Sequence, residues 1–478
     1  MSERCIIPFW SASVRADAPV AYLDGEVRLR YGELSREVQR WREDLRSIVV
    51  GDERPLVLFR TRNLPEVLAP LTAALAEKVP LMLVDAELPT ASLEALVERY
   101  RPAALIEPMP AGTAFHLCVT ARPTYPIDER LALLLSTSGS TGSPKFVRLS
   151  REALLDNAAA IATVLGIDRR DIGVAHLELH YSYGWSVVAS HLIRGAAVSF
   201  SRAAFTERGF WQSVRASEAT HFPGVPVHYE IMHRLRPERL QLPSVAVLTQ
   251  AGGRLDGTVR DAMHAFAEAQ GKRFFVMYGQ TEAAPRMSTL AHRDYVERPG
   301  SVGRALPGGH FEIVRADGTV LAAGESGDIV YRGRNVMQGY AQGWKDLVRG
   351  DELGGRLSTG DLGHLDGSGF LFIDGRRSRE GKVFGLRVNL DEIESFLSEL
   401  GPYYVCQSGA RVTAVRATSE RLGADIDDAE KRVLLMHLGR RFTVPPTAWR
   451  FRVMREIPLG NRGKVDHAAL QEMLGESD

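Results

Sequence analysis

The sequence predicts an α/β protein in which short apolar strands alternate with helices. Residues 55–59 and 79–84 are apolar runs typical of buried strands, and residues 64–78 between them have a helical pattern. Because a helix between two buried strands is the usual crossover of a parallel sheet, this alternation favours a parallel α/β sheet. With 478 residues, the chain is also long enough for a large core and for more than one domain.

Elements near the two ends of the chain extend this pattern. Asp24-Gly25 is a strong turn pair and predicts a hairpin, which an amphipathic helix at residues 31–45 follows. Further predicted elements are strands at 131–135, 173–179 and 245–248 and helices at 151–165, 391–400 and 428–442. The charged run at 375–385 suits an exposed linker between a large and a small domain.

The composition is ordinary for a globular protein and argues against several other classes. Hydrophobic residues make up 45% of the chain and charged residues 25%. Lysine plus arginine and aspartate plus glutamate each number 59, so the formal net charge is zero and no basic field favours nucleic acid as a partner.

Cysteine usage and hydropathy bear on the compartment. Cys5, Cys118 and Cys406 are far apart and form no CxxC pair, which argues against a disulfide framework or structural zinc. The N-terminus lacks a secretion signal, and no segment approaches the roughly 20 apolar residues that cross a bilayer. We therefore expect a cytoplasmic protein without a membrane span.

A loop rich in glycine and hydroxyl side chains follows the strand at 131–135. Its residues are Thr137, Ser138, Gly139, Ser140, Thr141, Gly142, Ser143, Pro144 and Lys145. Glycines let backbone N–H groups approach an anion, hydroxyls add donors and lysine adds positive charge, so the loop predicts a phosphate cradle. It differs from the loop of the common NTPases, because Pro144 precedes Lys145 and Phe146 follows it. A Ser/Gly-rich surface turn is the simpler alternative.

Three more motifs follow this loop at wide intervals. Residues 278–282 are Tyr-Gly-Gln-Thr-Glu, residues 358–361 are Ser-Thr-Gly-Asp, and residues 458–466 are Pro-Leu-Gly-Asn-Arg-Gly-Lys-Val-Asp. Each has a simpler interpretation alone: a strand end with a helix cap, a turn, and a surface loop. Together with the glycine-rich loop, and in this order, they resemble the motifs of the adenylate-forming superfamily. That superfamily includes acyl-CoA synthetases, adenylation domains of peptide synthetases, and luciferases.

The resemblance implies both an activity and a domain arrangement. The activity is ATP-dependent activation of a small carboxylic acid as acyl-AMP, with release of pyrophosphate, followed by acyl transfer to a thiol. ATP and Mg²⁺ would be required, and the thiol would belong to CoA or to the phosphopantetheine arm of a separate carrier protein. A large N-terminal AMP-binding domain with α/β sheets would span residues 1–375. A small mobile α+β domain with the catalytic lysine loop would span residues 376–478.

The resemblance also implies roles for single residues. Lys464 is the candidate catalytic lysine, Thr281 would bond the α-phosphate, and Glu282 would hold Mg²⁺. The residue types suit these roles, because a hydroxyl donates to phosphate oxygen and a carboxylate is a hard ligand for a hard cation. The expected nucleotide-binding residues are Thr137, Ser138, Gly139, Ser140, Thr141, Gly142, Lys145, Ala251, Gly252, Tyr278, Asp361 and Arg376.

The segment at 180–185 matches the part of the family that closes over the acid. The expected pocket residues are His180, Tyr181, Tyr183, Gly184 and Trp185, although an aromatic core patch explains the same composition. No acidic residue lies between His180 and Ser190, so an α-ammonium group has no evident partner there. An ordinary α-amino acid is therefore disfavoured as the substrate.

Ser378 occupies the family's hinge position, where relatives usually carry aspartate or lysine. We keep Ser378 as the predicted hinge but not the ion pair that usually accompanies it. A catalytically degraded relative that binds nucleotide and acts as a scaffold is the alternative to a ligase. The presence of the catalytic and nucleotide-binding residue types at their expected positions argues against that alternative.

Overall fold

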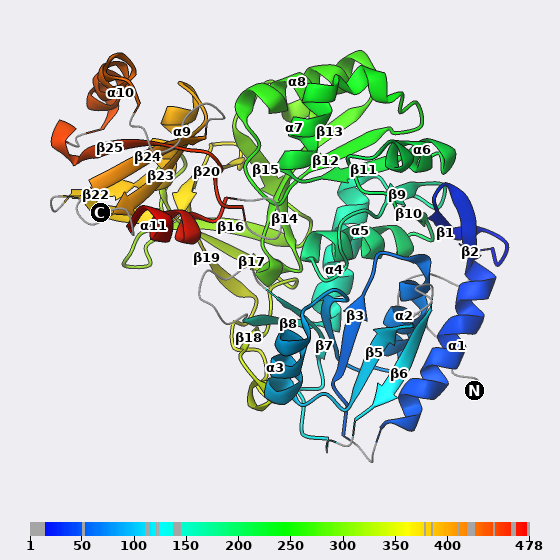
Figure 1. Cartoon of the computed structure of the whole chain (residues 1–478). Coiled ribbons are helices and arrows are strands. Elements are labelled where there is room, and N and C mark those ends of the chain that lie inside the picture. Colours follow the sequence, from blue (N-terminus) through cyan, green and yellow to red (C-terminus); the bar gives the residue numbers. More distant parts are fainter. Residues whose placement is uncertain are drawn as a thin grey trace. The chain divides into compact units, whose positions relative to one another are not determined.

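The computed structural model divides into two compact units (Figure 1). It describes residues 15–49, 53–109, 114–120, 122, 124–136, 145–376, 379–383, 386–408, 411–417, 426–442, 445–459 and 465–475. The first unit comprises Met1–Phe311 and Tyr331–Leu357, and the second comprises Glu312–Val330 and Ser358–Asp478. The domain border expected between residues 375 and 376 stays a prediction.

A seven-stranded sheet forms one layer of the first unit. In spatial order its strands are β18 (Gly339–Ala341), β8 (Phe146–Ser150), β7 (Leu131–Ser136), β4 (Leu81–Asp85), β3 (Val57–Thr61), β5 (Ala104–Pro108) and β6 (Phe115–Val119). The pairs β3–β4, β3–β5 and β4–β7 are parallel. The parallel arrangement expected from the strand–helix–strand pattern is therefore confirmed.

A second sheet of the first unit is also largely parallel. Its strands that lie wholly within the first unit are, in spatial order, β15 (Ser301–Ala305), β14 (Arg286–Leu290), β13 (Arg273–Gly279), β12 (Val247–Gln250), β11 (His221–Gly224), β9 (Ile172–Val174), β10 (Ala197–Phe200), β1 (Pro19–Leu23) and β2 (Glu26–Arg30). The run from β13 through β12, β11, β9 and β10 to β1 is parallel. The predicted hairpin is β1–β2, and its turn residues Asp24 and Gly25 have φ of 52° and 91°, as a tight turn of this kind requires.

Helices connect and cover these strands. They are α1 (Tyr31–Ser47), α2 (Leu68–Ala76), α3 (Thr90–Tyr100), α4 (Arg151–Leu165), α5 (Ser182–Leu192), α6 (Arg208–Ala216), α7 (Pro226–Leu235) and α8 (Gly257–Ala269), with short 3₁₀ helices η1 (Pro65–Val67), η2 (Pro237–Leu240), η3 (Thr281–Ala283), η4 (His292–Asp294) and η5 (Trp344–Asp346). Figure 1 shows α4 and α5 between the two sheets, and α4 contacts strands of both. Both helices are consequently placed in the interior of this unit.

Helix α4 has the bounds expected from the sequence because local signals define both of its ends. The Ser150 side chain accepts a hydrogen bond from the Ala153 N–H at 3.0 Å, and Gly166 ends the helix with φ of 71°. The strand expected at 173–179 is wrong in length, since only Ile172–Val174 form β9. Leu177 and Leu179 are buried in the turn before α5, so tertiary packing accounts for their apolar character.

The second unit contains smaller sheets and three described helices. Its elements are β20 (Leu371–Arg376), β21 (Glu380–Val383), β22 (Leu386–Asn389), α9 (Leu390–Ser398), β23 (Tyr403–Ser408), β24 (Arg411–Ala417), α10 (Asp428–Arg441), η7 (Pro446–Ala448), β25 (Trp449–Met454) and α11 (His467–Gly475). Strands β16 (Gly309–Val314), β17 (Gly327–Gly333) and β19 (Arg356–Leu365) cross the border between the units along the chain. Helices α9 and α10 confirm the two helices expected in this part of the chain.

Strands β23, β24 and β25 form a three-stranded sheet that carries the core of the second unit. The α/β class expected from the sequence, with large N-terminal sheets and a small C-terminal unit, is confirmed. Among the described residues, no helix combines the length and the apolar character that a bilayer crossing demands.

Candidate functional site

Glu282, the predicted metal ligand, lies where separate segments of the first unit meet. It follows β13 in η3, and the Met337 N–H donates to its carbonyl oxygen at 2.8 Å. The Tyr340 hydroxyl, on β18, donates to Glu282 Oε1 at 2.8 Å. The ammonium of Lys145 lies 5.8 Å from the centre of the Tyr340 ring. One tyrosine therefore contacts both the end of the predicted phosphate loop and the predicted metal carboxylate.

The carboxylate of Glu282 fits a hard cation. Burial, and after it the Glu282 charge, raise the pKa of the Tyr340 hydroxyl above its usual value, so the hydroxyl keeps its proton and donates. Within the described part of the chain, no donor is bonded to the second carboxylate oxygen, Oε2. An oriented carboxylate with one oxygen left for a ligand is the donor that Mg²⁺ prefers.

The predicted acid-binding segment approaches the predicted phosphate ligand. Ser182, the first residue of α5, has its Oγ 3.0 Å from Thr281 Oγ1. The turn before α5 packs tightly on the helix, since a Cβ on Gly184 would lie 2.2 Å from the Glu178 carbonyl oxygen and 2.4 Å from that of Leu177. Gly184 is thus required by packing, which places Ser182 against Thr281.

Gly252 lets the end of β12 approach Tyr181. Its φ of 85° favours glycine, and a Cβ there would lie 2.5 Å from the Tyr181 hydroxyl oxygen. The neighbouring Ala251 is fully buried, and its N–H donates to the Gly224 carbonyl at 3.1 Å. Small residues are needed at both positions, while the adenine contacts expected for Ala251, Gly252 and Tyr278 stay predictions.

The second unit brings its two predicted nucleotide ligands together. Asp361 on β19 and Arg376 on β20 are partners in the antiparallel pairing, and Arg376 Nε lies 2.8 Å from Asp361 Oδ1. Asp361 is 2% exposed, and its N–H donates to Thr359 Oγ1 at 3.1 Å. The arginine orients a carboxylate that can accept two hydroxyl hydrogens from a diol.

Eight of the predicted residues lie outside the described part of the chain. They are Thr137, Ser138, Gly139, Ser140, Thr141 and Gly142 of the phosphate loop, the hinge residue Ser378, and the candidate catalytic residue Lys464. Their roles stay predictions that rest on the sequence.

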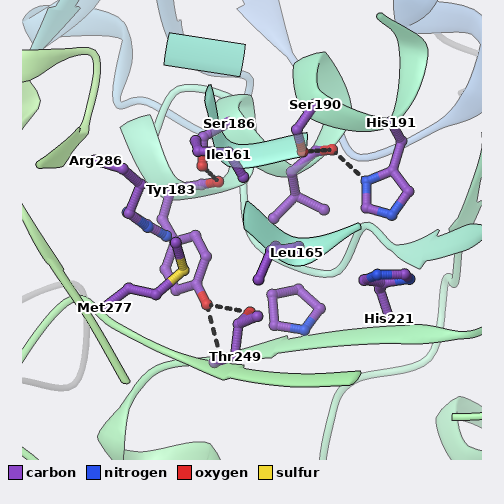
Figure 2. A pocket seen from close by; sticks show the side chains of 12 residues that line it. Ile161, Leu165, Tyr183, Ser186, Ser190, His191, His221, Thr249, Met277 and Arg286 are labelled. Atoms are coloured by element: carbon purple, nitrogen blue, oxygen red, sulfur yellow. Dashed lines mark hydrogen bonds between the residues drawn. The ribbon is translucent and has the colours of Figure 1, made fainter. Parts of the chain in front are cut away.

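A cavity lies beside the predicted acid-binding segment, among α4, α5 and strands β11 to β14 (Figure 2). Its lining residues are Ile161, Leu165, Tyr183, Ser186, Val187, Ser190, His191, His221, Pro223, Thr249, Met277 and Arg286. Of the expected pocket residues, Tyr183 lines this space and its hydroxyl donates to the Thr249 carbonyl at 2.8 Å. Trp185 is 1% exposed and ranks among the largest fully buried side chains.

Sequence reasoning missed three residues of this region. Tyr340, Ser182 and Arg286 were not singled out, although each contacts a predicted residue or lines the cavity. For Tyr340 and Ser182 the relevant contacts join segments 58 and 99 residues apart. No local pattern reports such contacts.

Comparison with known proteins agrees with the motifs. The family model of the AMP-binding enzyme matches residues 9–341. The chain belongs to this family. An indoleacetate–CoA ligase from Aromatoleum aromaticum is 29% identical over 270 residues, which cover 56% of this chain and 52% of that ligase. A sulfoacetate–CoA ligase from Cupriavidus necator is 30% identical over 376 residues, covering 76% of this chain and 70% of that ligase. The chain thus spans about half the length of the first of these AMP-binding relatives.

Solved structures of AMP-binding relatives show the same fold. ATP-bound MatB from Rhodopseudomonas palustris has a TM-score of 0.79 at 20% identity, and 97% of each chain is covered. The o-succinylbenzoate CoA synthetase MenE from Bacillus subtilis, in complex with the acyl-adenylate OSB-AMP, has a TM-score of 0.74 at 22% identity, with 95% of each chain covered. At these identities the likeness establishes the fold alone.

Proposed function

We propose that this protein is an ATP-dependent acid–CoA ligase that activates a carboxylic acid as acyl-AMP. One observation carries the proposal: Lys145, Tyr340 and Glu282 contact one another in series although they come from three separate segments. Two of these three were expected at an adenylation site from the motifs. Membership of the AMP-binding family supports the same conclusion.

The reaction joins two anions and needs groups that neutralise them. A carboxylate oxygen attacks the α-phosphorus of ATP, the bond to the β-phosphate bridge breaks, and acyl-AMP and pyrophosphate form. A thiolate then attacks the acyl carbon, and AMP leaves with the electron pair of the broken C–O bond. Positioning and charge neutralisation are the protein's main contributions to such steps.

The described residues supply part of this apparatus. Thr281 would donate to the α-phosphate, Lys145 would meet the outer phosphates, and Glu282, held by Tyr340, would bind Mg²⁺. Bound Mg²⁺ would shield the phosphate charge. Asp361, held by Arg376, would accept the ribose hydroxyls.

The step itself would depend on Lys464, whose ammonium would lie between the carboxylate and the α-phosphate. Because a thiol must later reach the same carbon, Lys464 must also withdraw. A small domain at residues 376–478 that turns about Ser378 would satisfy both needs. This division and hinge belong to the proposal.

CoA is the favoured acceptor, because the two relatives described above are named as CoA ligases. The two names do not indicate one kind of acid substrate, since indoleacetate has one acidic group and sulfoacetate has two. A carrier-protein thiol would serve the same chemistry and is an outcome of the test.

Pyrophosphate release tests the proposal. Purified protein is given ATP, Mg²⁺ and each member of a panel of carboxylic acids, with hydroxylamine, with CoA, and with neither. We expect release that depends on one class of acid with hydroxylamine, and faster turnover with CoA. If CoA gives no acceleration, a carrier protein is the acceptor. If no acid gives release while ATP still binds, the ligase proposal is wrong and the scaffold alternative stands.

A further inference from the structure

Arg286 places a positive charge in the wall of a largely apolar cavity. It is 3% exposed and begins β14, and its side chain is one of those that line the space in Figure 2. Arg286 is the one lining residue that carries a formal charge at neutral pH if the histidines are neutral. This makes the guanidinium the dominant electrostatic feature of the cavity.

The histidines of the cavity do not add to that charge. His191 and His221 lie on the opposite side of the cavity from Arg286 in Figure 2. Burial lowers the pKa of both, to about 2 for His221, so both imidazoles are neutral at physiological pH. His191 Nδ1 lies 2.8 Å from the Val187 carbonyl, which fixes its proton on that nitrogen. Arginine cannot lose its charge in the same way.

No carboxylate of the described chain neutralises Arg286. Its guanidinium carbon lies 3.8 Å from the centre of the Tyr183 ring, so the guanidinium stacks on that ring. Stacking on an aromatic ring is a weaker compensation than an ion pair, and buried charges in proteins are nearly always paired. The described part of the chain therefore supplies a site for an anion without supplying the anion itself.

The backbone of Arg286 is fixed on both sides. The Asn157 amide donates to the Arg286 carbonyl at 2.7 Å, and the Arg286 N–H donates to Asn157 Oδ1 at 3.2 Å. The Asn335 amide donates to the same carbonyl at 3.0 Å. Both asparagines are buried. The backbone from which the guanidinium projects is therefore held in place, which favours preorganisation of the site.

The cavity adjoins the predicted adenylation residues. Tyr183 follows Ser182, which contacts Thr281, and Arg286 comes soon after Thr281 in the chain. The cavity has a volume of about 20 Å³. That is room for one or two waters, or for one compact polar group, rather than for a long apolar chain.

We propose that the acid activated by this protein is short and carries a second anionic group, which pairs with Arg286. The inference rests on the proposed ligase function and adds the substrate class. The first carboxylate would lie near Thr281 and react, while the second anionic group would remain unreacted at the guanidinium. A carboxylate or a sulfonate satisfies this chemistry, and arginine binds either through two parallel hydrogen bonds.

The test compares acids that differ only in the second anionic group. Pyrophosphate release with hydroxylamine is measured for oxalate, malonate, succinate and glutarate, for the monoacids of matching length, and for sulfoacetate. Wild type is compared with Arg286→Gln, with Arg286→Lys, and with Arg273→Gln. Arg273 is the matched control, because it also stacks on an aromatic ring, Phe275, but is exposed and lies outside the cavity lining.

We expect wild type to prefer one diacid over its monoacid by roughly 100-fold in kcat/KM, the scale of losing one partner of a buried charge pair. Arg286→Gln should abolish that preference by lowering the activity on the diacid far more than the activity on the monoacid. Arg286→Lys should keep part of the preference, and Arg273→Gln should leave it intact. Sulfoacetate then decides whether the second group is a carboxylate or a sulfonate.

Two results would overturn the substrate class and leave the ligase function standing: equal activity of wild type on both classes of acid, or equal loss on both in Arg286→Gln. Should Arg286→Gln fail to fold, the wild-type ratio and the Arg286→Lys variant decide. No pyrophosphate release with any acid would instead refute the ligase function, and this inference with it.

Discussion

Two buried arginines of the first unit show how a charge can be accommodated in a protein interior. Arg148 on β8 is 0% exposed, forms an ion pair with Glu352, and donates to the carbonyls of Gln338 and Gly350 at 3.2 and 3.3 Å. Arg286 is almost as buried but has no carboxylate among the described residues. Gly339 makes room for the ion pair between Arg148 and Glu352, because a Cβ at this position would lie 2.6 Å from an Arg148 nitrogen.

The difference separates a structural charge from a binding charge. Around Arg148 the chain provides both a carboxylate, Glu352, and carbonyl acceptors. The arginine therefore joins β8 to Gln338, just before β18, and to Glu352, after it. Around Arg286 the chain provides a cavity. A buried charge that the chain leaves unpaired is therefore a better indication of a ligand than burial alone.

The largest expected effect concerns the structural arginine. Arg148→Met should lower the free energy of unfolding by about 3 kcal/mol, because buried carbonyls lose their donor. Arg286→Met should change it by less than about 1 kcal/mol, since removing an unpaired buried charge offsets the lost packing. Urea denaturation midpoints of both variants check this, and equal losses would erase the distinction between the two arginines.

Lys464 extends the comparison to a charge that serves the reaction. Lys464→Ala should reduce adenylation by roughly 100-fold or more, the scale seen when one transition-state donor is removed. Its denaturation midpoint should match that of wild type. The measurement is ATP–pyrophosphate exchange with the preferred acid, and full exchange in the variant would show that the loop is misassigned.

Asp361 is an intermediate case, a buried carboxylate that the chain pairs and that is also expected to bind ligand. Asp361→Ala should raise the Michaelis constant for ATP by roughly tenfold, because two hydrogen bonds to the ribose are lost. The effect on kcat should be smaller. Steady-state kinetics at varied ATP checks the expectation, and an unchanged Michaelis constant would remove the ribose role.

Tyr340→Phe should have a smaller effect, since one neutral donor to Glu282 is lost. We expect a several-fold rise in the Mg²⁺ concentration that gives half-maximal activity, because the carboxylate loses the contact that orients it. Titration of Mg²⁺ at saturating ATP measures it. An identical titration for both proteins would show that Tyr340 does not position the metal ligand.

Buried histidines offer the most general contrast, because they can lose their charge by deprotonation and arginine cannot. His228 lies with its Nδ1 3.2 Å from His176 Nε2, and burial lowers its pKa to about 4. In the unfolded chain this imidazole binds a proton below about pH 6.5, whereas in the folded protein it does so only below about pH 4. Its contribution to stability is therefore fully present above pH 6.5 and is lost as the pH falls from 6.5 to 4.

At pH 5.5 this loss amounts to about 1.4 kcal/mol for one histidine. Thermal midpoints at pH 7.5 and 5.5 should therefore differ less in His228→Phe than in wild type. His116→Gln, at an exposed position, is the control and should behave as wild type does. If the thermal midpoint of His228→Phe changes between the two pH values as much as that of wild type, other groups cause the pH dependence.

Local signals decided how much could be predicted. Helix α4 was predicted to the residue, because Ser150 and Gly166 mark its ends within the sequence itself. The strand expected at 173–179 was too long, since Leu177 and Leu179 are buried in the turn before α5 rather than in a sheet. The overall α/β class was indicated by the alternation of strands and helices and by the resemblance, and it was confirmed.

The site divides in the same way. Glu282 and Thr281 were identifiable because a contiguous motif contains them, whereas Tyr340 reaches Glu282 across 58 residues of chain. Arg286 lies in a strand where four of five residues, Arg286 included, are buried, so alternation gives no sign that its side chain faces a cavity. Non-local contacts of this kind follow only from the folded chain.

Oxygen transfer tests the central claim, acyl-adenylate formation, most directly. The preferred acid is labelled with ¹⁸O in its carboxylate and incubated with the protein, ATP, Mg²⁺ and CoA, and the nucleotide is analysed by mass spectrometry. Attack of the carboxylate on the α-phosphorus predicts AMP that carries one ¹⁸O atom, acyl-CoA that keeps the other ¹⁸O in its carbonyl group, and unlabelled pyrophosphate. Formation of ADP with the label in inorganic phosphate would show attack on the γ-phosphorus and would contradict the account.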